Sequence, residues 1–156
     1  MATLESQQEW EARAIEFLAE PVPAEVKKRG VLTVADVLSS TVAGSTIETI
    51  DRVGRSASLA DGHSSILGTD RLVNPGGAAL VNAAASIAQE IEEGHNEGGH
   101  VGAGIVTGGF ALAEHADISG ETFLEACVKS YELCVRIEHA MFAMKARIDD
   151  SIPWQL

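Results

Sequence analysis

The chain has 156 residues, of which 46% are hydrophobic and 22% charged, which is typical of one globular domain with a proper core. Eleven basic residues face 23 acidic ones, and the net charge of −12 argues against nucleic acid and anionic membrane surfaces as partners. It leaves small anionic substrates open, because a local site can invert the global field. No signal-peptide pattern or bilayer-length apolar run is present, so we predict a cytoplasmic protein with a single domain over residues 1–156.

The first half of the chain predicts three helices. Apolar residues at spacings of three and four indicate a helix over residues 4–20. A second helix starts near Pro23 and closes at residues 43–45. We expect its apolar face to consist of Val26, Val31, Val34, Val37 and Leu38. A third helix is predicted over residues 46–59, and a short extended piece follows at residues 64–68.

The second half predicts three more helices. Asn74 is the N-cap of a fourth helix, which is rich in alanine and runs to residue 92 or 93. Glycines break it, and a fifth helix covers about residues 100–115. Ser119 caps a sixth helix, which continues to about Ala146. The glycines of the fifth helix predict that another backbone presses against it: Gly102, Gly104, Gly108 and Gly109.

No strand alternation of any length and no internal repeat is present in the sequence. The fold class predicted from the pattern is therefore all-α, with about six helices. The chain closes on an apolar segment that ends in Trp154 and Leu156. Because terminal tails are usually polar, this segment predicts a partner chain or a continuation of the domain.

We expect any chemistry at the joint between the fourth and fifth helices, where four carboxylates and two imidazoles lie within residues 90–100. Glu90 and Glu93 are three apart, so a continuous helix places both on one face. His100 falls in the first turn of the next helix, where free N–H groups and the helix dipole favour an anion. Together these groups can hold a substrate carboxylate and move a proton next to it.

Two other interpretations of these residues stay open. The carboxylates are also typical of a solvated helix end and loop. The pairs Glu92/His95 and Glu97/His100 have the Glu-x-x-His spacing of di-iron bundles, which requires a continuous helix that Gly94 and Gly98 interrupt. We therefore predict no metal. The sequence also has no P-loop and no Rossmann fingerprint, so we predict no cofactor.

Several separated segments occur together in the order found in a known family. They are residues 68–70, the segment 74–82 (NPGGAALVN), the acidic cluster, residues 100–103, residues 113–114, the helix opening at residues 119–124 and the segment 130–137 (SYELCVRI). In these segments the chain resembles the MmgE/PrpD family, which includes 2-methylcitrate dehydratase, cis-aconitate decarboxylase and iminodisuccinate epimerase. The resemblance covers about residues 26–137. It implies the N-terminal part of a large helical domain that is joined to a smaller α/β domain, a dimer, and chemistry on small di- or tricarboxylates without metal or organic cofactor.

The resemblance also implies roles for particular residues. Glu90 matches the family's active-site aspartate and His100 its active-site histidine, so we predict both as catalytic. Val101 stands where the family usually has proline. The substrate-binding residues predicted around this pair are Glu93, His95, Asn96 and Gly102.

The function predicted from the sequence is the N-terminal part or small subunit of a cofactor-independent lyase or epimerase. Its partners would be a small polycarboxylate and a second copy or another chain. The resemblance implies that the family's later histidine, lysines and tyrosine, and its second domain, lie beyond Leu156. Three alternatives stay open: a separate chain supplies them, the sequence is a fragment, or the activity is lost. The alternatives are a non-catalytic helical interaction subunit and a carboxylate/histidine metal-binding protein.

Overall fold

The computed structural model describes residues 4–56, 61–96 and 99–145. Over these residues the all-α fold is confirmed, since six helices are accompanied only by a two-stranded antiparallel hairpin. The elements are α1 (Leu4–Ala19), α2 (Ala24–Ser45), α3 (Glu48–Ser56), β1 (Ser64–Ser65), β2 (Leu72–Val73), α4 (Pro75–Ile87), α5 (Val101–His115) and α6 (Gly120–Lys145). The predicted end of the third helix lies outside the described residues.

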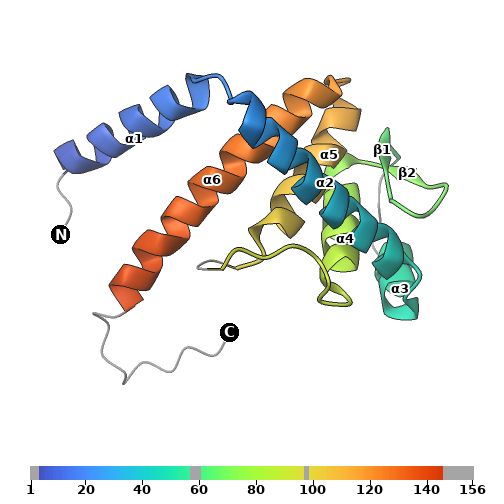
Figure 1. The fold of residues 1–156 in the computed structure, drawn as a ribbon. Coiled ribbons are helices and arrows are strands. Elements are labelled where there is room, and N and C mark those ends of the chain that lie inside the picture. Colours follow the sequence, from blue (N-terminus) through green and yellow to red (C-terminus); the bar gives the residue numbers. More distant parts are fainter. Residues whose placement is uncertain (1–3, 57–60, 97–98, 146–156) are drawn as a thin grey trace.

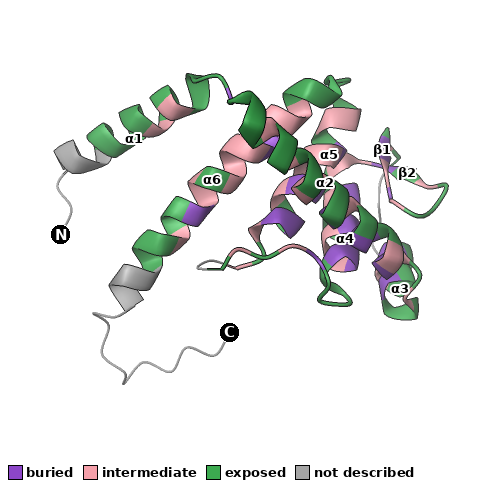
Figure 2. Ribbon diagram, viewed as in Figure 1, coloured by how far each residue is buried: buried purple, intermediate pink, exposed green. Residues whose placement is uncertain are grey.

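Helix α4 is the centre of the fold and packs against α2 on one side and α5 on the other (Figure 1). Helix α6 packs on α5 and α2, whereas α1 stands at the opposite side of the molecule from α3. Most buried positions gather on α2, α4 and α5, and α1 is mainly exposed (Figure 2). The molecule is therefore a small helical layer with one outlying helix.

Small side chains let the central helices approach closely. The buried face of α4 consists mostly of small residues, namely Gly77, Ala78, Val81, Asn82, Ala85 and Ser86. A Cβ on Gly44 of α2 would lie 1.9 Å from the carbonyl oxygen of Ala85. Only glycine fits at that crossing, because any side chain would collide with backbone. The close backbone contact predicted for the glycines of α5 is wrong. Gly104 and Gly108 have open space beside them, and Gly102 and Gly109 face side chains of Glu93 and of Phe123 and Cys127, not backbone.

The predicted apolar face of α2 is partly wrong. Val37 is fully buried, but Val26 and Val31 are 42% and 50% exposed. The inner face of α2 instead contains Ser40 and Thr41, whose hydroxyls donate to the carbonyl of Val37. Hydroxyls that bond back to their own helix can be buried at little cost, so Ser40 and Thr41 can occupy the buried face of α2.

The capping predictions are confirmed for α4 and α6. The side chain of Asn74 accepts a hydrogen bond from the N–H of Gly77 at 2.8 Å. The hydroxyl of Ser119 accepts one from the N–H of Thr122 at 3.2 Å. These two caps fix where each helix begins, and hence where the segments before α4 and α6 must turn.

The predicted end of the fourth helix is wrong. Helix α4 ends at Ile87, five or six residues earlier than expected, and the chain then turns. Glu90 has a φ of 51°, a left-handed conformation that a helix cannot accommodate. Glu90, Glu92 and Glu93 therefore lie in an irregular segment after the end of α4 and not on a helix face.

Candidate functional site

The segment between α4 and α5 brings a buried carboxylate onto the side chain of His100. Oε1 of Glu92 lies 3.1 Å from Nδ1 of His100, and the Glu92 side chain is 3% exposed while the imidazole is 55% exposed. A carboxylate only accepts hydrogen bonds, so Nδ1 carries the proton in this contact. Nε2 of His100 is then left to exchange a proton with a bound molecule.

The second oxygen of Glu92 is unusual. Oε2 is buried and has no hydrogen-bond partner among the described residues. A buried carboxylate oxygen without a partner is costly, and such groups are concentrated at sites where the protein uses them. The geometry therefore points to Glu92 as a group held in place for a role beyond packing.

A second carboxylate fixes the start of α5. Oε1 of Glu93 accepts the N–H of Gly102 at 2.8 Å, and the hydroxyl of Tyr131 donates to Oε2 of Glu93 at 2.5 Å. Burial raises the pKa of the Tyr131 phenol well above its ordinary range, and the hydrogen bond to Glu93 raises it further. A Cβ at position 102 would lie 2.2 Å from Oε1 of Glu93, so this contact requires glycine.

Helix α6 supplies the remaining contacts from residues two turns beyond Tyr131. Oε2 of Glu138 accepts the N–H of Gly99 at 3.0 Å. The ring of His95 lies 6.4 Å from that of Tyr131 and 5.8 Å from that of His139, centroid to centroid. Residues seven or eight apart share a helix face, so α6 presents Tyr131, Glu138 and His139 to the same segment.

The structure brings some of the predicted site residues together and leaves others apart. His100, Glu93 and Gly102 lie at the start of α5, and His95 lies beside Tyr131. Asn96 is exposed.

Two geometric expectations are corrected. Glu90 is exposed and does not share a helix face with Glu93, because α4 has ended and the backbone of Glu90 is left-handed. The N–H of Gly102 is not free for a substrate anion, since Glu93 occupies it. The chain thus satisfies part of this helix start with its own carboxylate.

Three contributors to the cluster were missed in the sequence. Glu92 is one of the carboxylates that the sequence also places in a solvated helix end or loop, and Tyr131 and Glu138 are not among the residues predicted for the site. A signal existed for Tyr131, because a tyrosine in an apolar stripe needs a partner for its hydroxyl. No signal existed for Glu92, whose burial depends on the path of an irregular segment.

The metal interpretation finds no support in the geometry. Within residues 4–56, 61–96 and 99–145, no group of three or more His, Cys, Asp or Glu side chains could hold a metal ion. Glu92 and His95 do not lie on a helix, so their spacing does not place them on one face. Glu97 lies outside the described residues.

Positive charge is missing from the cluster. The sequence contains no lysine or arginine from residue 72 to residue 128. Among the described residues, Glu92, Glu93 and Glu138 form no ion pair with a lysine or arginine. The three carboxylates therefore make the local field negative unless an imidazole is protonated.

Among the described helices, none is by itself long and apolar enough to cross a bilayer. The pair α2 and α3 passes the same test of length and composition only when taken together, and it is bent by 88°.

Comparison with known families decides the relationship. The profile of the MmgE/PrpD N-terminal domain matches residues 13–153, which include every residue of the cluster. The chain belongs to the MmgE/PrpD family. This confirms the resemblance seen in the sequence and makes the chain a relative of dehydratases and epimerases. No curated protein and no solved structure matches the chain.

Proposed function

We propose that this MmgE/PrpD domain is part of a cofactor-independent lyase or epimerase that acts on a small di- or tricarboxylate. The observation that carries the proposal is the contact between buried Glu92 and half-exposed His100 at 3.1 Å. A carboxylate behind an imidazole fixes its orientation and stabilises the imidazolium that forms when the ring takes a proton. That pair is suited to removing a proton from a carbon next to a carboxyl group.

The neighbouring residues have distinct parts in this proposal. Glu93 and Tyr131 hold the start of α5, and with it the backbone that carries His100. His95 and Asn96 lie on the segment that leads to His100 and are proposed substrate contacts. Glu90 keeps its correspondence to the family's aspartate and is proposed as a second proton-transfer group that would reach the substrate from the exposed side of the segment.

The missing positive charge bears on the partner. A di- or tricarboxylate needs cationic groups to offset its charge, and the cluster contains no lysine or arginine. We therefore propose that a second chain, or another copy of this one, supplies lysine, arginine or protonated histidine across the open side of His100. The complete site would then lie between chains.

The direct test is proton exchange in deuterated water. The chain, alone and with any chain that co-purifies, is incubated with a panel of small di- and tricarboxylates, and loss of the α-proton signal is followed by NMR. A general base contributes about 10²- to 10⁴-fold, so His100→Ala and Glu92→Gln should lower the exchange rate within that range. His115→Ala, at the exposed far end of α5, is the matched control.

Exchange that survives His100→Ala unchanged would assign the chemistry to other residues. Exchange that also persists in Glu92→Gln but disappears in Glu90→Gln would favour the family correspondence over the observed contact. A complex that assembles but exchanges no proton on any acid of the panel would contradict the enzyme proposal.

A non-catalytic interaction subunit is the second candidate, because one observation favours it. Helix α1 is mainly exposed and carries large apolar side chains that are half or more exposed, such as Trp10 at 53% and Ile15 at 69%. An exposed apolar helix is a usual docking element. Under this alternative, truncation of α1 would abolish binding of the partner while Glu92→Gln would have no measurable effect on any property of the complex.

A further inference from the structure

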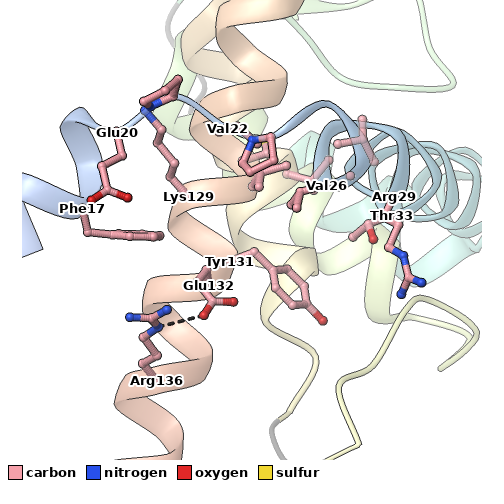
Figure 3. Close-up of a pocket in the computed structure, with 17 residues that line it drawn as sticks. Phe17, Glu20, Val22, Val26, Arg29, Thr33, Lys129, Tyr131, Glu132 and Arg136 are labelled. Atoms are coloured by element: carbon pink, nitrogen blue, oxygen red, sulfur yellow. Dashed lines mark hydrogen bonds and ion pairs between the residues drawn. The ribbon is translucent and has the colours of Figure 1, made fainter.

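A cavity separate from the acidic cluster lies between the end of α1, the connection to α2, and the facing sides of α2 and α6 (Figure 3). Its volume is about 450 Å³, within the range of pockets that bind small molecules. Most of the lining is aliphatic, and the side chains of Val22, Val26, Val34 and Val128 belong to it. The cavity therefore has a mainly apolar binding surface.

Two polar side chains on α2 line this cavity without a partner. Arg29 and Thr33 are four residues apart, so they lie on the same helix face. Neither makes a hydrogen bond or ion pair with any described residue. The other described hydroxyls of α2 all bond back to carbonyls of their own helix, as Ser40 and Thr41 do. Thr33 is therefore the exception on α2, and it faces a hollow.

The other charged groups of the cavity are already engaged or lie at its far end. Arg136 donates to Glu132 at 2.7 Å and stacks on the ring of Phe17, 5.0 Å from its centroid. Lys129 donates to the carbonyl of Leu18 at 2.8 Å. Glu20 lies beside Phe17, away from Arg29 (Figure 3). Among the described residues, Arg29 forms no ion pair with a carboxylate, so its positive charge at this end of the cavity is unpaired.

We propose that this cavity binds a small amphipathic carboxylic acid, with its apolar chain along the valines and its carboxylate on Arg29 and Thr33. A guanidinium pairs with a carboxylate through two parallel hydrogen bonds, and a hydroxyl one turn away can donate a third. This ligand class differs from the polar polycarboxylate of the proposed function, because a polar acid has no apolar chain to pack against the aliphatic lining.

The cavity and the acidic cluster meet at Tyr131. The residue is part of the cavity lining, and its hydroxyl donates to Glu93. A ligand in the cavity would contact the ring whose hydroxyl holds the start of α5. Binding should therefore be detectable at the amide of Gly102, which bonds to the same carboxylate.

The experiment is calorimetric titration of the full chain with sodium octanoate, with octan-1-ol and succinate as probes that each lack one half of the ligand. We expect saturable 1:1 binding of octanoate, at least tenfold weaker binding of octan-1-ol, and no binding of succinate. From hexanoate to octanoate the affinity should rise roughly fourfold for each methylene buried. An NMR shift of the Gly102 amide on octanoate binding would place the ligand against Tyr131.

Two arginine variants distinguish a specific role of the Arg29 guanidinium from a general effect of removing one positive charge. Arg29→Gln should weaken octanoate binding about tenfold and Thr33→Val several-fold, in line with a charged and a neutral hydrogen bond. Arg52→Gln, on an exposed part of α3 outside the cavity, removes the same charge and should leave binding unchanged. Thermal unfolding of each variant without ligand confirms that the fold is kept.

Three results would overturn the proposal: absence of saturable octanoate binding, equal binding of octan-1-ol, or equal loss in Arg29→Gln and Arg52→Gln. An acidic, apolar peptide that binds where octanoate does not would also overturn it, since the cavity would then be a protein-docking groove. None of these measurements requires turnover, so failure here is distinct from failure of the lyase or epimerase proposal.

Discussion

The hydroxyl of Tyr131 donates to Oε2 of Glu93 across 2.5 Å, and this bond joins the middle of α6 to the segment that precedes α5. The other oxygen of the same carboxylate holds the N–H of Gly102. The Glu93 side chain thus links α6 to the start of α5. The position of His100, two residues before Gly102, follows from this arrangement.

The titration of Tyr131 can be measured without interference, because the chain contains one tyrosine. Burial and the hydrogen bond to Glu93 raise its pKa well above the ordinary 10.0, so tyrosinate absorbance at 295 nm should appear only at strongly alkaline pH. In Glu93→Gln the midpoint should move down towards 10, though not the whole way, because burial is the larger cause. A midpoint near 10 in the folded wild-type chain, with circular dichroism unchanged, would contradict the buried hydrogen bond.

The same raised pKa predicts how stability depends on pH. The folded state keeps the Tyr131 proton more tightly than the unfolded state, so its contribution is fully present below about pH 10. The contribution is lost as pH rises through the folded pKa. Urea unfolding at a series of pH values should show a steeper alkaline loss in wild type than in Tyr131→Phe, which lacks the titrating group.

Two glycines of α5 form a matched pair for stability. Gly102→Ala places a Cβ 2.2 Å from Oε1 of Glu93, so the carboxylate must leave its bonds, and we expect a loss of about 1–3 kcal/mol. Gly104→Ala meets nothing within 4 Å and improves helix propensity, so we expect a gain of about 0.5–1 kcal/mol. Denaturant unfolding of both variants is the measurement. Equal changes in the free energy of unfolding for the two variants would show that the hydrogen bonds of Glu93 do not require glycine at position 102.

The crossing of α2 and α4 should tolerate no side chain at Gly44. The added Cβ would lie 1.9 Å from the carbonyl oxygen of Ala85, and backbone cannot move aside as a side chain can. We expect Gly44→Ala to cost about 3 kcal/mol or more, at the upper end for overpacking. Gly108→Ala, which meets nothing within 4 Å, controls for the substitution itself. A Gly44→Ala chain with wild-type stability would mean that the two helices are farther apart in solution.

The two cysteines should differ in reactivity. Burial raises the pKa of the Cys127 thiol to about 12, whereas Cys134 is only half-buried. Only the thiolate reacts, so the raised pKa leaves very little reactive Cys127 at pH 8. Iodoacetamide should therefore label Cys134 well before Cys127, as peptide mass analysis at short times would show. Equal rates in urea provide the control, and equal rates in native buffer would be inconsistent with the buried position.

The helices could be predicted from the sequence because their signals are local. Periodic apolar residues located α1 and α6, and the side chains of Asn74 and Ser119 marked two starts that the structure confirms. The end of α4 could not be predicted in this way. The sequence after Ile87 has no proline or glycine before Gly94, and only the left-handed backbone of Glu90 shows that the helix has stopped.

The sequence by itself determined that the chain is helical, that it belongs with the MmgE/PrpD proteins, and that residues 90–102 concentrate its carboxylates and imidazoles. Only the tertiary structure decided which of these side chains meet: Glu92 contacts His100, Glu93 contacts Tyr131 and Gly102, and Glu90 takes part in none of these contacts. The reason is that periodicity fixes side-chain direction only on a regular helix. In an irregular segment, each direction depends on backbone angles set by contacts with distant residues, here those of α6.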